Sequence, residues 1–449
     1  MENNNTIQVA VDSGLCNGCS MCAVVCPQNC ITLRETPGGL LNAFIDKGSC
    51  TKCGACRKVC GGLALNGKSL PSDWDAFKGN ALGVYLVKAV NPDLRKNGQS
   101  GGAAITIASA LLESGEINGV LSTEMPKDGT LRPFSRIVRK QEELFQTQGS
   151  KYVPIPWAEA LRELAPEQDR IAVIGIPCQF RSLSNALQTV RKKWANSIAL
   201  KIGLVCEGVL SYHVLDHIFA LSSISREECA EYRFKSKIPN GWPGDGRAVL
   251  FDGQAVFVPN RIRTGCKNAF RPLYCQMCFD KVNVLSDVVC ADPWGINTNK
   301  EGHTVVLVRT PKGLDALNKA VKSGFLDVEE ITLEQFFEVQ QVEARRTFWT
   351  SAKGIVPKQG GMIPDYPVAT KWYAKTVDSS TRRLNKALIE RGKLLHEAKN
   401  RESVLDTIPH FNENIKELHA KIVFWNKWGP IALTKRIVGM VLRAFRLKK

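Results

Sequence analysis

Two cysteine runs with the same spacing constrain this 449-residue chain more than any other feature. The first run reads Cys16-x-x-Cys19-x-x-Cys22-x-x-x-Cys26-Pro27, and the second reads Cys50-x-x-Cys53-x-x-Cys56-x-x-x-Cys60-Gly61. This tight spacing lets three thiolates of one loop surround one metal centre. A segment of this kind folds around the metal centre that its thiolates bind, because metal ligation takes the place of a large apolar core.

The pattern resembles that of bacterial two-cluster ferredoxins, and it predicts two [4Fe–4S] clusters. Soft thiolate sulfur suits iron, and each cubane needs four thiolates. Three ligands of each cluster would come from one run and the fourth from the other run. The predicted ligand sets are Cys16, Cys19, Cys22 and Cys60 for one cluster, and Cys50, Cys53, Cys56 and Cys26 for the other.

A disulfide framework and a zinc site are the alternatives for these cysteines. A disulfide framework needs an oxidising compartment, and no signal peptide precedes the first run. Zinc uses Cys-x-x-Cys pairs, but hardly two full four-cysteine runs. The sixteen cysteines of the chain therefore favour a reducing cytoplasm and metal binding. Cys30 lies outside both runs and is interpreted as a small buried residue.

Charge and hydropathy limit the classes of partner. The formal net charge of +17 favours acidic partners, namely a redox protein, an anionic substrate or an anionic membrane surface. Nucleic acid is not expected, because no nucleic-acid motif accompanies the charge. No apolar run reaches the roughly 18 residues of a membrane span, so no transmembrane helix is predicted.

Four segments are expected along the chain. Residues 1–70 are predicted to form an α+β ferredoxin-like domain, with a leading strand over 1–12 and short strands over 31–33 and 43–45. An α/β flavin-binding module should follow in two parts, 81–160 and 161–350. Residues 365–449 are expected to form a helical, basic C-terminal tail.

Strands and helices alternate in the middle of the chain, which indicates a parallel α/β unit. The expected strands cover residues 83–87, 119–121, 170–175, 198–205, 288–290 and 304–309. The expected helices cover residues 103–113, 180–194, 211–221, 312–323 and 333–345. Residues 229–270 are interpreted as a more irregular segment with short strands over 248–251 and 255–258.

Two cysteines follow successive predicted strands of this unit. Cys178 and Cys206 mark the carboxyl ends of those strands, where open α/β sheets bind ligands. The Cys275-x-x-Cys278 pair has the spacing at which two thiolates chelate one centre. These four thiols are the natural ligands of a third metal centre, and zinc is the alternative to a cluster there.

Several stretches together resemble the beta subunit of coenzyme F420 hydrogenase/dehydrogenase. They are Gln99–Gly102, Gly149–Tyr152, Gly175–Gln179, Gly203–Cys206, Cys275–Asp280 and Ala291–Gly295. The resemblance covers roughly residues 13–345. Known members carry FAD and [4Fe–4S] clusters and include reductases of deazaflavin and chlorophyll derivatives, and similar bacterial proteins occur with polysaccharide biosynthesis genes.

The resemblance implies cofactors at particular residues. A third cluster would be held by Cys178, Cys206, Cys275 and Cys278, beside FAD. The flavin would lie near Ser100, Gly101, Gly102, Ser150 and Lys151. The glycine-rich loop over residues 97–102 leads into a helix and could expose N–H groups to an anion, although a plain tight turn is the alternative.

Clusters that lead to a flavin would join a one-electron donor to a two-electron substrate. The favoured interpretation is a cytoplasmic, FAD-dependent iron–sulfur oxidoreductase that takes electrons from reduced ferredoxin or another one-electron redox protein and reduces a small molecule. An electron-transfer subunit of a larger complex, without its own substrate, is the first alternative. An iron–sulfur scaffold protein at the membrane is the second. The candidates for a catalytic acid are His213, His217 and Asp292. The sequence gives no reason to prefer one of them.

The last thirty residues are strongly basic. From Ala420 to Lys449 there are eight Lys or Arg residues and no acidic residue. Apolar residues recur there at helical spacing, with Arg436, Arg443 and Arg446 on the other side. This pattern is typical of a basic amphipathic helix on an anionic membrane surface, here the inner face of the membrane. A helix docked on the protein core with a solvated basic face is the alternative.

Overall fold

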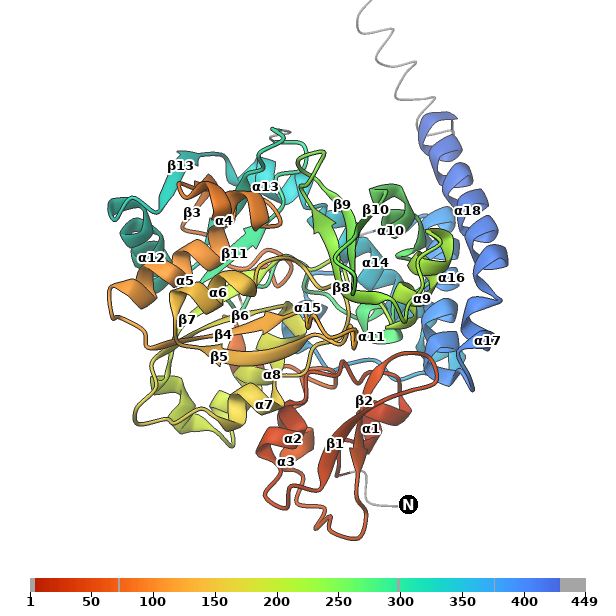
Figure 1. Cartoon of the computed structure of the whole chain (residues 1–449). Helices are drawn as coiled ribbons and strands as arrows, with labels where there is room; N and C mark the ends of the chain where they lie inside the picture. Colours follow the sequence, from red (N-terminus) through yellow and green to blue (C-terminus); the bar gives the residue numbers. More distant parts are fainter. Residues whose placement is uncertain (1–4, 72, 297–298, 375, 429–449) are drawn as a thin grey trace, which may run out of the picture.

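The computed structural model describes residues 5–71, 73–296, 299–374 and 376–428. The N-terminal unit lies below a large mixed sheet, and the C-terminal helices run along one side of the molecule (Figure 1). Within the described residues, no helix combines the length and apolar composition needed to cross a membrane. The predicted basic amphipathic helix falls mostly on residues 429–449, outside the described part of the chain.

The N-terminal unit is small and built around a hairpin. Strand β1 (Ile31–Glu35) pairs antiparallel with β2 (Leu41–Ile45), as the sequence predicts. Three short helices accompany the hairpin: α1 (Gln8–Asp12), α2 (Met21–Val25) and α3 (Ala55–Lys58). The predicted leading strand is wrong, because Ile7 and Ala10 are both buried at a spacing of three residues, which suits a helix.

The large sheet has eight strands in the order β13-β3-β12-β11-β7-β6-β4-β5. Strands β4, β6, β7 and β11 are parallel neighbours, which confirms the predicted parallel unit, and the remaining pairs are antiparallel. The bounds in chain order are β3 Gly83–Ala89, β4 Gly119–Glu124, β5 Phe134–Val138, β6 Ile171–Gly175, β7 Ile198–Leu204, β11 Val288–Ala291, β12 Thr304–Val308 and β13 Leu326–Glu330.

Both faces of this sheet are covered, which explains the near-continuous apolar runs of its central strands. One face packs against α5 (Ala103–Glu113), α6 (Gln141–Gln146) and α12 (Pro311–Lys322). The other face shares a core with α7 (Ala158–Arg162), α8 (Pro177–Gln188) and the N-terminal unit. The N-terminal unit also contacts α8, which begins just after β6, and therefore lies near the carboxyl end of that strand.

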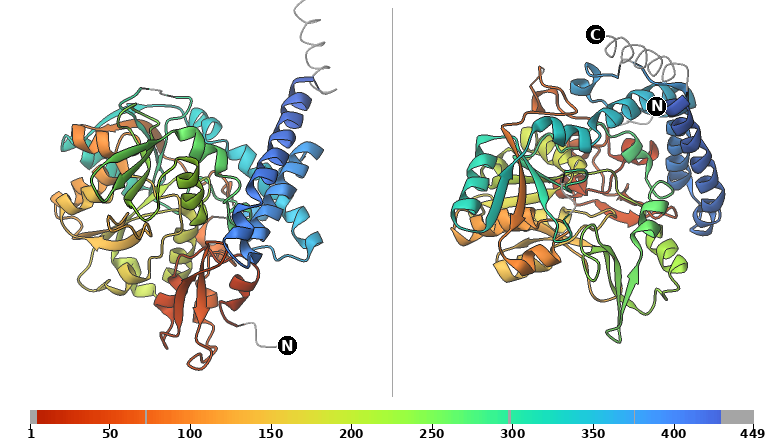
Figure 2. Two further views of the ribbon diagram at one scale, coloured as in Figure 1. Left: turned by 45° about the vertical axis from the view of Figure 1, so that its right-hand side comes forward. Right: turned by 90° about the horizontal axis from the view of Figure 1, so that it is seen from above.

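A second core forms around a three-stranded antiparallel sheet, β8 (Cys229–Ser236), β9 (Asp245–Leu250) and β10 (Ala255–Val258). Helices α9 (His213–Leu221) and α10 (Asn260–Cys266) pack against it. Buried residues of α16 (Ser379–Glu397) and α18 (Ile408–Trp428) complete this core. Figure 2 shows these C-terminal helices on the side away from the large sheet.

The structure describes six further helices, which lie between or beside these parts of the chain. They are α4 (Pro92–Asn97), α11 (Leu273–Gln276), α13 (Leu333–Val339), α14 (Val342–Ile355), α15 (Pro367–Thr370) and α17 (Glu402–Leu405). The single helix predicted over 333–345 is wrong, because Gln341 adopts a positive φ of 52° and separates α13 from α14. The helix predicted over 180–194 begins earlier, at Pro177, and ends at Gln188.

Trp157 joins the N-terminal unit to the sheet. Its indole ring is fully buried against Phe180 of α8, with ring centroids 5.9 Å apart. Its backbone N–H donates to Ser20 Oγ at 2.8 Å. We expect Trp157→Ala to lower the free energy of unfolding by about 3–5 kcal/mol, because it empties a closely packed site.

Chemical denaturation of the full chain checks this cost. Phe251→Ala removes an aromatic ring that is 62% exposed and should change stability by about 0.5 kcal/mol or less. Equal losses in the two variants would contradict the packing role of Trp157.

Candidate functional site: three cysteine sites and a polar network

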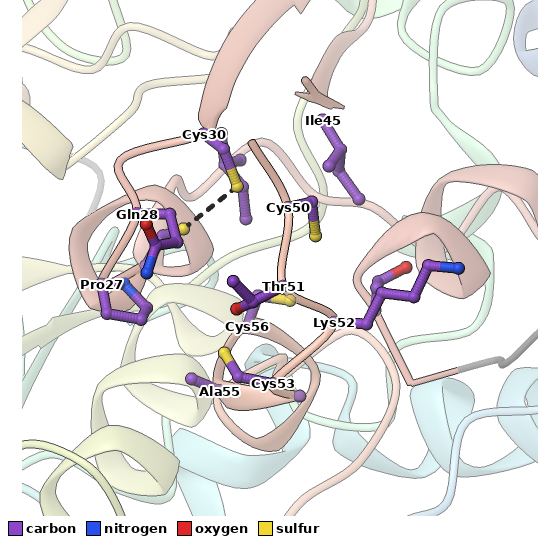
Figure 3. A pocket seen from close by; sticks show the side chains of 14 residues that line it. Pro27, Gln28, Cys30, Ile45, Cys50, Thr51, Lys52, Cys53, Ala55 and Cys56 are labelled. Carbon is purple, nitrogen blue, oxygen red and sulfur yellow. Dashed lines mark hydrogen bonds between the residues drawn. The ribbon is translucent and has the colours of Figure 1, made fainter. Parts of the chain in front are cut away.

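The first cysteine site lies in the N-terminal unit, in what we call the distal pocket. Figure 3 shows cysteine side chains around it. The structure brings the predicted set Cys26, Cys50, Cys53 and Cys56 together there. Cys30 lines the same pocket, and its Sγ lies 3.4 Å from Cys26 Sγ, so this fifth thiol is closer to the site than the spacing of the runs suggests.

The other predicted N-terminal set is also gathered in space, and we call it the proximal set: Cys16, Cys19, Cys22 and Cys60. Burial raises the pKa of Cys22 well above its usual value, and the charges of its three partners in the set raise it further. Iron binding would displace the protons of the four thiols, and the positive charge of the iron would balance the thiolate charges. The residues present therefore fit a cluster with four thiolate ligands.

The third site is a pocket beyond the carboxyl ends of β6 and β7, which we call the central pocket. It is lined by the four cysteines that the sequence grouped together: Cys178, Cys206, Cys275 and Cys278. Cys178 lies in the first turn of α8, and Cys206 follows the end of the neighbouring strand β7. Cys275 lies in α11, and Cys278 follows two residues after that helix.

The charged residues that line the central pocket are Arg181, Arg345, Glu207 and Asp280, and further positive side chains lie behind them. Arg181 Nη1 donates to Cys278 Sγ at 3.4 Å, and Arg345 Nη1 donates to the Cys275 carbonyl at 3.4 Å. Lys281 forms an ion pair of 2.7 Å with Glu207, which also lies near Arg271 and Arg345. Burial alone would raise the pKa of Glu207, but the three positive charges outweigh it and lower this pKa to about 2. The pocket is thus suited to a negatively charged group.

Burial disfavours the thiolate form of several cysteines in the central pocket. Burial raises the pKa of Cys206 to about 12 and that of Cys275 to about 11. Among the described residues, no three His, Cys, Asp or Glu side chains are gathered closely enough to hold one metal ion. The four thiols instead surround a cavity, an arrangement in which each can bind a different iron of a cubane.

The glycine-rich loop is constrained by packing on two strands. A Cβ on Gly101 would lie 2.4 Å from the Val87 carbonyl oxygen and 2.7 Å from the Thr304 nitrogen, so only glycine fits. The Gly101 N–H donates to Thr304 Oγ1 at 2.9 Å and is therefore already used. Gly102 adopts a φ of 83° where α5 begins. A structural requirement thus accounts for both glycines.

Ser100 belongs to a buried polar network beside this loop. Its hydroxyl donates to Asp292 Oδ1, and Lys235 Nζ donates to Asp292 Oδ2 at 2.8 Å. Lys235 Nζ also lies 5.6 Å from the ring centroid of Trp294. Both amide atoms of Gln99 are buried and have no partner among the described residues. A buried amide without a partner needs an explanation, and a bound polar ligand is one.

The second predicted flavin segment reaches the same network through an aromatic ring. Lys235 Nζ lies 5.8 Å from the ring centroid of Tyr152, the residue after Lys151. Burial lowers the pKa of Lys151 to about 7, and its Nζ donates to the Thr147 carbonyl at 2.6 Å. Ser150 is half-buried. The structure therefore brings the two predicted segments to neighbouring positions.

The two histidines proposed as catalytic acids have structural partners. His213 contacts the Pro37 carbonyl at 2.9 Å and Asp216 at 3.2 Å, so it secures the N-terminal hairpin. His217 packs against the ring of Phe270. Among the described residues, Asp292 is the one candidate for a catalytic acid that belongs to the polar network. The structure therefore favours Asp292 over the two histidines.

The sequence analysis missed the charged residues at both sites. Arg181 lies three residues after Cys178 on the same helix face, and this spacing could have indicated it. Lys235 lies in strand β8, which the sequence analysis treated as irregular, so its pairing with Asp292 had no local signal. Arg271, Lys281 and Arg345 come from distant segments that only the tertiary structure brings together.

Comparison with known proteins places these features in one family. Residues 84–162 and 168–334 match the N-terminal and C-terminal parts of the family described as coenzyme F420 hydrogenase/dehydrogenase, beta subunit. Residues 15–61 match a 4Fe-4S dicluster domain. The first two matches together span more than half of the chain, and the third coincides with the two cysteine runs.

Individual relatives are distant. An uncharacterised protein of Methanocaldococcus jannaschii is 24% identical over 362 residues, which cover 75% of this chain and 95% of that protein. The coenzyme F420-dependent sulfite reductase of the same organism is 25% identical over 384 residues, which cover 78% of this chain and 54% of the reductase. The chain thus spans about half the length of this second relative.

A solved structure shares the fold. A chain of the F420-reducing [NiFe] hydrogenase complex from Methanosarcina barkeri aligns with a TM-score of 0.51 and 20% sequence identity, covering 64% of this chain and 97% of that chain. The chain is therefore a member of the coenzyme F420 hydrogenase/dehydrogenase beta-subunit family, an iron–sulfur oxidoreductase family, and it carries a 4Fe-4S dicluster domain ahead of the two family-specific parts.

Proposed function

We propose that this protein is an electron-transfer subunit that connects three [4Fe–4S] clusters to a two-electron carrier. The observation that carries the proposal is the central pocket, where four cysteines from separate elements line a cavity beside the N-terminal unit. Its charged surroundings support a cluster of net negative charge. A redox assembly with partner subunits suits this arrangement better than an enzyme that acts alone.

The ligands would be the proximal set, four thiols of the distal pocket and the four cysteines of the central pocket. When bound, the clusters would supply one-electron chemistry at these three sites. Cys53 is exposed at the distal pocket, which makes this pocket the natural contact point for a one-electron redox protein such as ferredoxin. Arg181 and Arg345 would balance the thiolate charges at the central pocket.

The two-electron carrier would bind beside the Ser100–Asp292–Lys235 network. The family description and the F420-dependent relative favour a deazaflavin of the F420 type. FAD in this region stays a prediction. Lys235 would hold a proton at Nζ between Asp292 and the ligand, and the unpaired amide of Gln99 would orient the polar edge of a ring. The final substrate is defined here only as a two-electron acceptor or donor.

A reductase with its own small-molecule substrate is the second candidate, and the buried network around Asp292 is the observation that favours it. The two functions differ in what the isolated chain can do. Turnover with a small molecule and an artificial one-electron donor would support the reductase. Turnover only after a partner subunit is added would support the electron-transfer subunit.

Cys278→Ser tests the central pocket. We expect the anaerobically purified variant to contain about four fewer iron atoms per chain, because one thiolate of a cubane is lost. Electrons should still enter the N-terminal clusters but should reach a bound flavin or deazaflavin more slowly. Iron analysis and stopped-flow absorbance check these two expectations.

Cys266→Ser is the control for a cysteine substitution as such, because Cys266 is a buried thiol that lies outside the three cysteine sites. It should retain the iron content of the native chain. Native iron content and native reduction rate in Cys278→Ser would mean that the four cysteines are ordinary buried thiols. Loss of iron with a native rate would place the third cluster off the electron path.

We also propose that the basic segment from Ala420 to Lys449 binds anionic membrane surfaces. Each basic residue near such a surface contributes about 1 kcal/mol, and this segment has eight and no acidic residue. Deletion of residues 420–449, which removes all eight, should abolish sedimentation with vesicles that contain anionic lipid. Equal sedimentation of the truncated and full chains would contradict the proposal, and neutral vesicles serve as the control.

A further inference from the structure

Helix α8 connects the proximal set to the central pocket. Four of its side chains, Cys178, Arg181, Ser182 and Asn185, recur at a spacing of three and four residues and therefore share one face. Cys178 lines the central pocket. Asn185 Nδ2 donates to the Ala64 carbonyl of the N-terminal unit at 2.9 Å. The same face thus touches both cysteine sites.

Ser182 contacts a cysteine of the proximal set directly. Cys19 Sγ lies 3.3 Å from Ser182 Oγ, and the Gly61 N–H donates to the same oxygen at 3.1 Å. The hydroxyl itself donates to the Cys178 carbonyl at 3.3 Å. Ser182 is fully buried, so no water competes for these bonds.

Arg181 makes the corresponding contact at the central pocket. Its Nη1 donates to Cys278 Sγ at 3.4 Å, and its Nε donates to the Gly61 carbonyl at 3.2 Å. The guanidinium carbon lies 5.2 Å from the ring centroid of Tyr366, whose hydroxyl donates to the same Gly61 carbonyl at 2.8 Å. Arg181 therefore bridges a central-pocket thiol and the residue that follows Cys60.

Gly61 makes this close contact possible. A Cβ at this position would lie 2.7 Å from the Ser182 nitrogen and 2.7 Å from Arg181 Cβ. Neither contact can be relieved without moving the helix. This requirement explains why the second cysteine run ends in Cys60-Gly61, whereas the first ends in Cys26-Pro27.

We infer that Arg181 and Ser182 are positioning residues that give one hydrogen bond each to ligand thiolates of two different clusters and thereby raise both reduction potentials. The inference rests on the proposed function. A ligand thiolate carries no proton and can only accept, so the Ser182 hydroxyl would turn from the Cys178 carbonyl to Cys19 Sγ. Donors to cluster sulfurs favour the reduced, more negative state, and such bonds are among the factors that set cluster potentials.

A redox titration of the full chain followed by EPR tests the inference. Ser182→Ala should shift the proximal cluster to a lower potential and leave the central cluster unchanged. Arg181→Gln should shift the central cluster to a lower potential, and Arg181→Lys, which keeps the charge, should shift it less. Iron content should stay at the native value in Ser182→Ala, because that change removes a single oxygen.

Ser184→Ala is the matched control. Ser184 lies on the same helix but bonds Ser69 Oγ and Gln188 Nε2 instead of a cysteine, so both potentials should keep their native values. Native potentials in Ser182→Ala and Arg181→Gln with full iron content would overturn the inference. If the native chain itself lacks a third cluster signal, the proposed function fails instead, and Ser182→Ala still tests the bond to the proximal cluster.

Discussion

The contact between helix α8 and Gly61 determines how the two halves of this protein meet. The buried apolar residues of the N-terminal unit belong to the same hydrophobic core as those of α7, α8 and one face of the large sheet. Helix α8 contacts this unit through backbone and side-chain hydrogen bonds around Gly61, and Trp157 adds a large buried ring nearby. Because α8 begins at the carboxyl end of β6, the same contact places the proximal set beside the central pocket.

The pairing of buried charges is the second constraint on the structure. Buried charges are stable in proteins only when they are paired, and removal of one partner is costly. Around the central pocket, Glu207 meets three positive groups and Arg181 points at a thiol. The excess of positive charge would be balanced by a cluster with thiolate ligands. In the Ser100–Asp292–Lys235 network, the buried charge of Lys235 is likewise paired with that of Asp292.

Much of the fold and the cysteine sites could be predicted from the sequence. Fixed spacing identifies the two cysteine runs, and strand-end position identifies Cys178 and Cys206, because both signals are local. Strand β8 was missed although its alternation of charged and apolar residues is typical of a strand. The burial of Lys235 could not be predicted, because it depends on Asp292 far along the chain. The gathering of Arg271, Lys281 and Arg345 around Glu207 also depends on tertiary contacts between distant segments.

The most direct test of the central claim is Mössbauer spectroscopy of the ⁵⁷Fe-labelled full chain, purified without oxygen, with metal and sulfide analysis of the same sample. Three clusters in one chain predict about twelve iron atoms and about twelve sulfides, all in [4Fe–4S] form. About eight iron atoms together with one zinc would contradict the claim, because the central pocket would then hold a single ion and could not relay electrons.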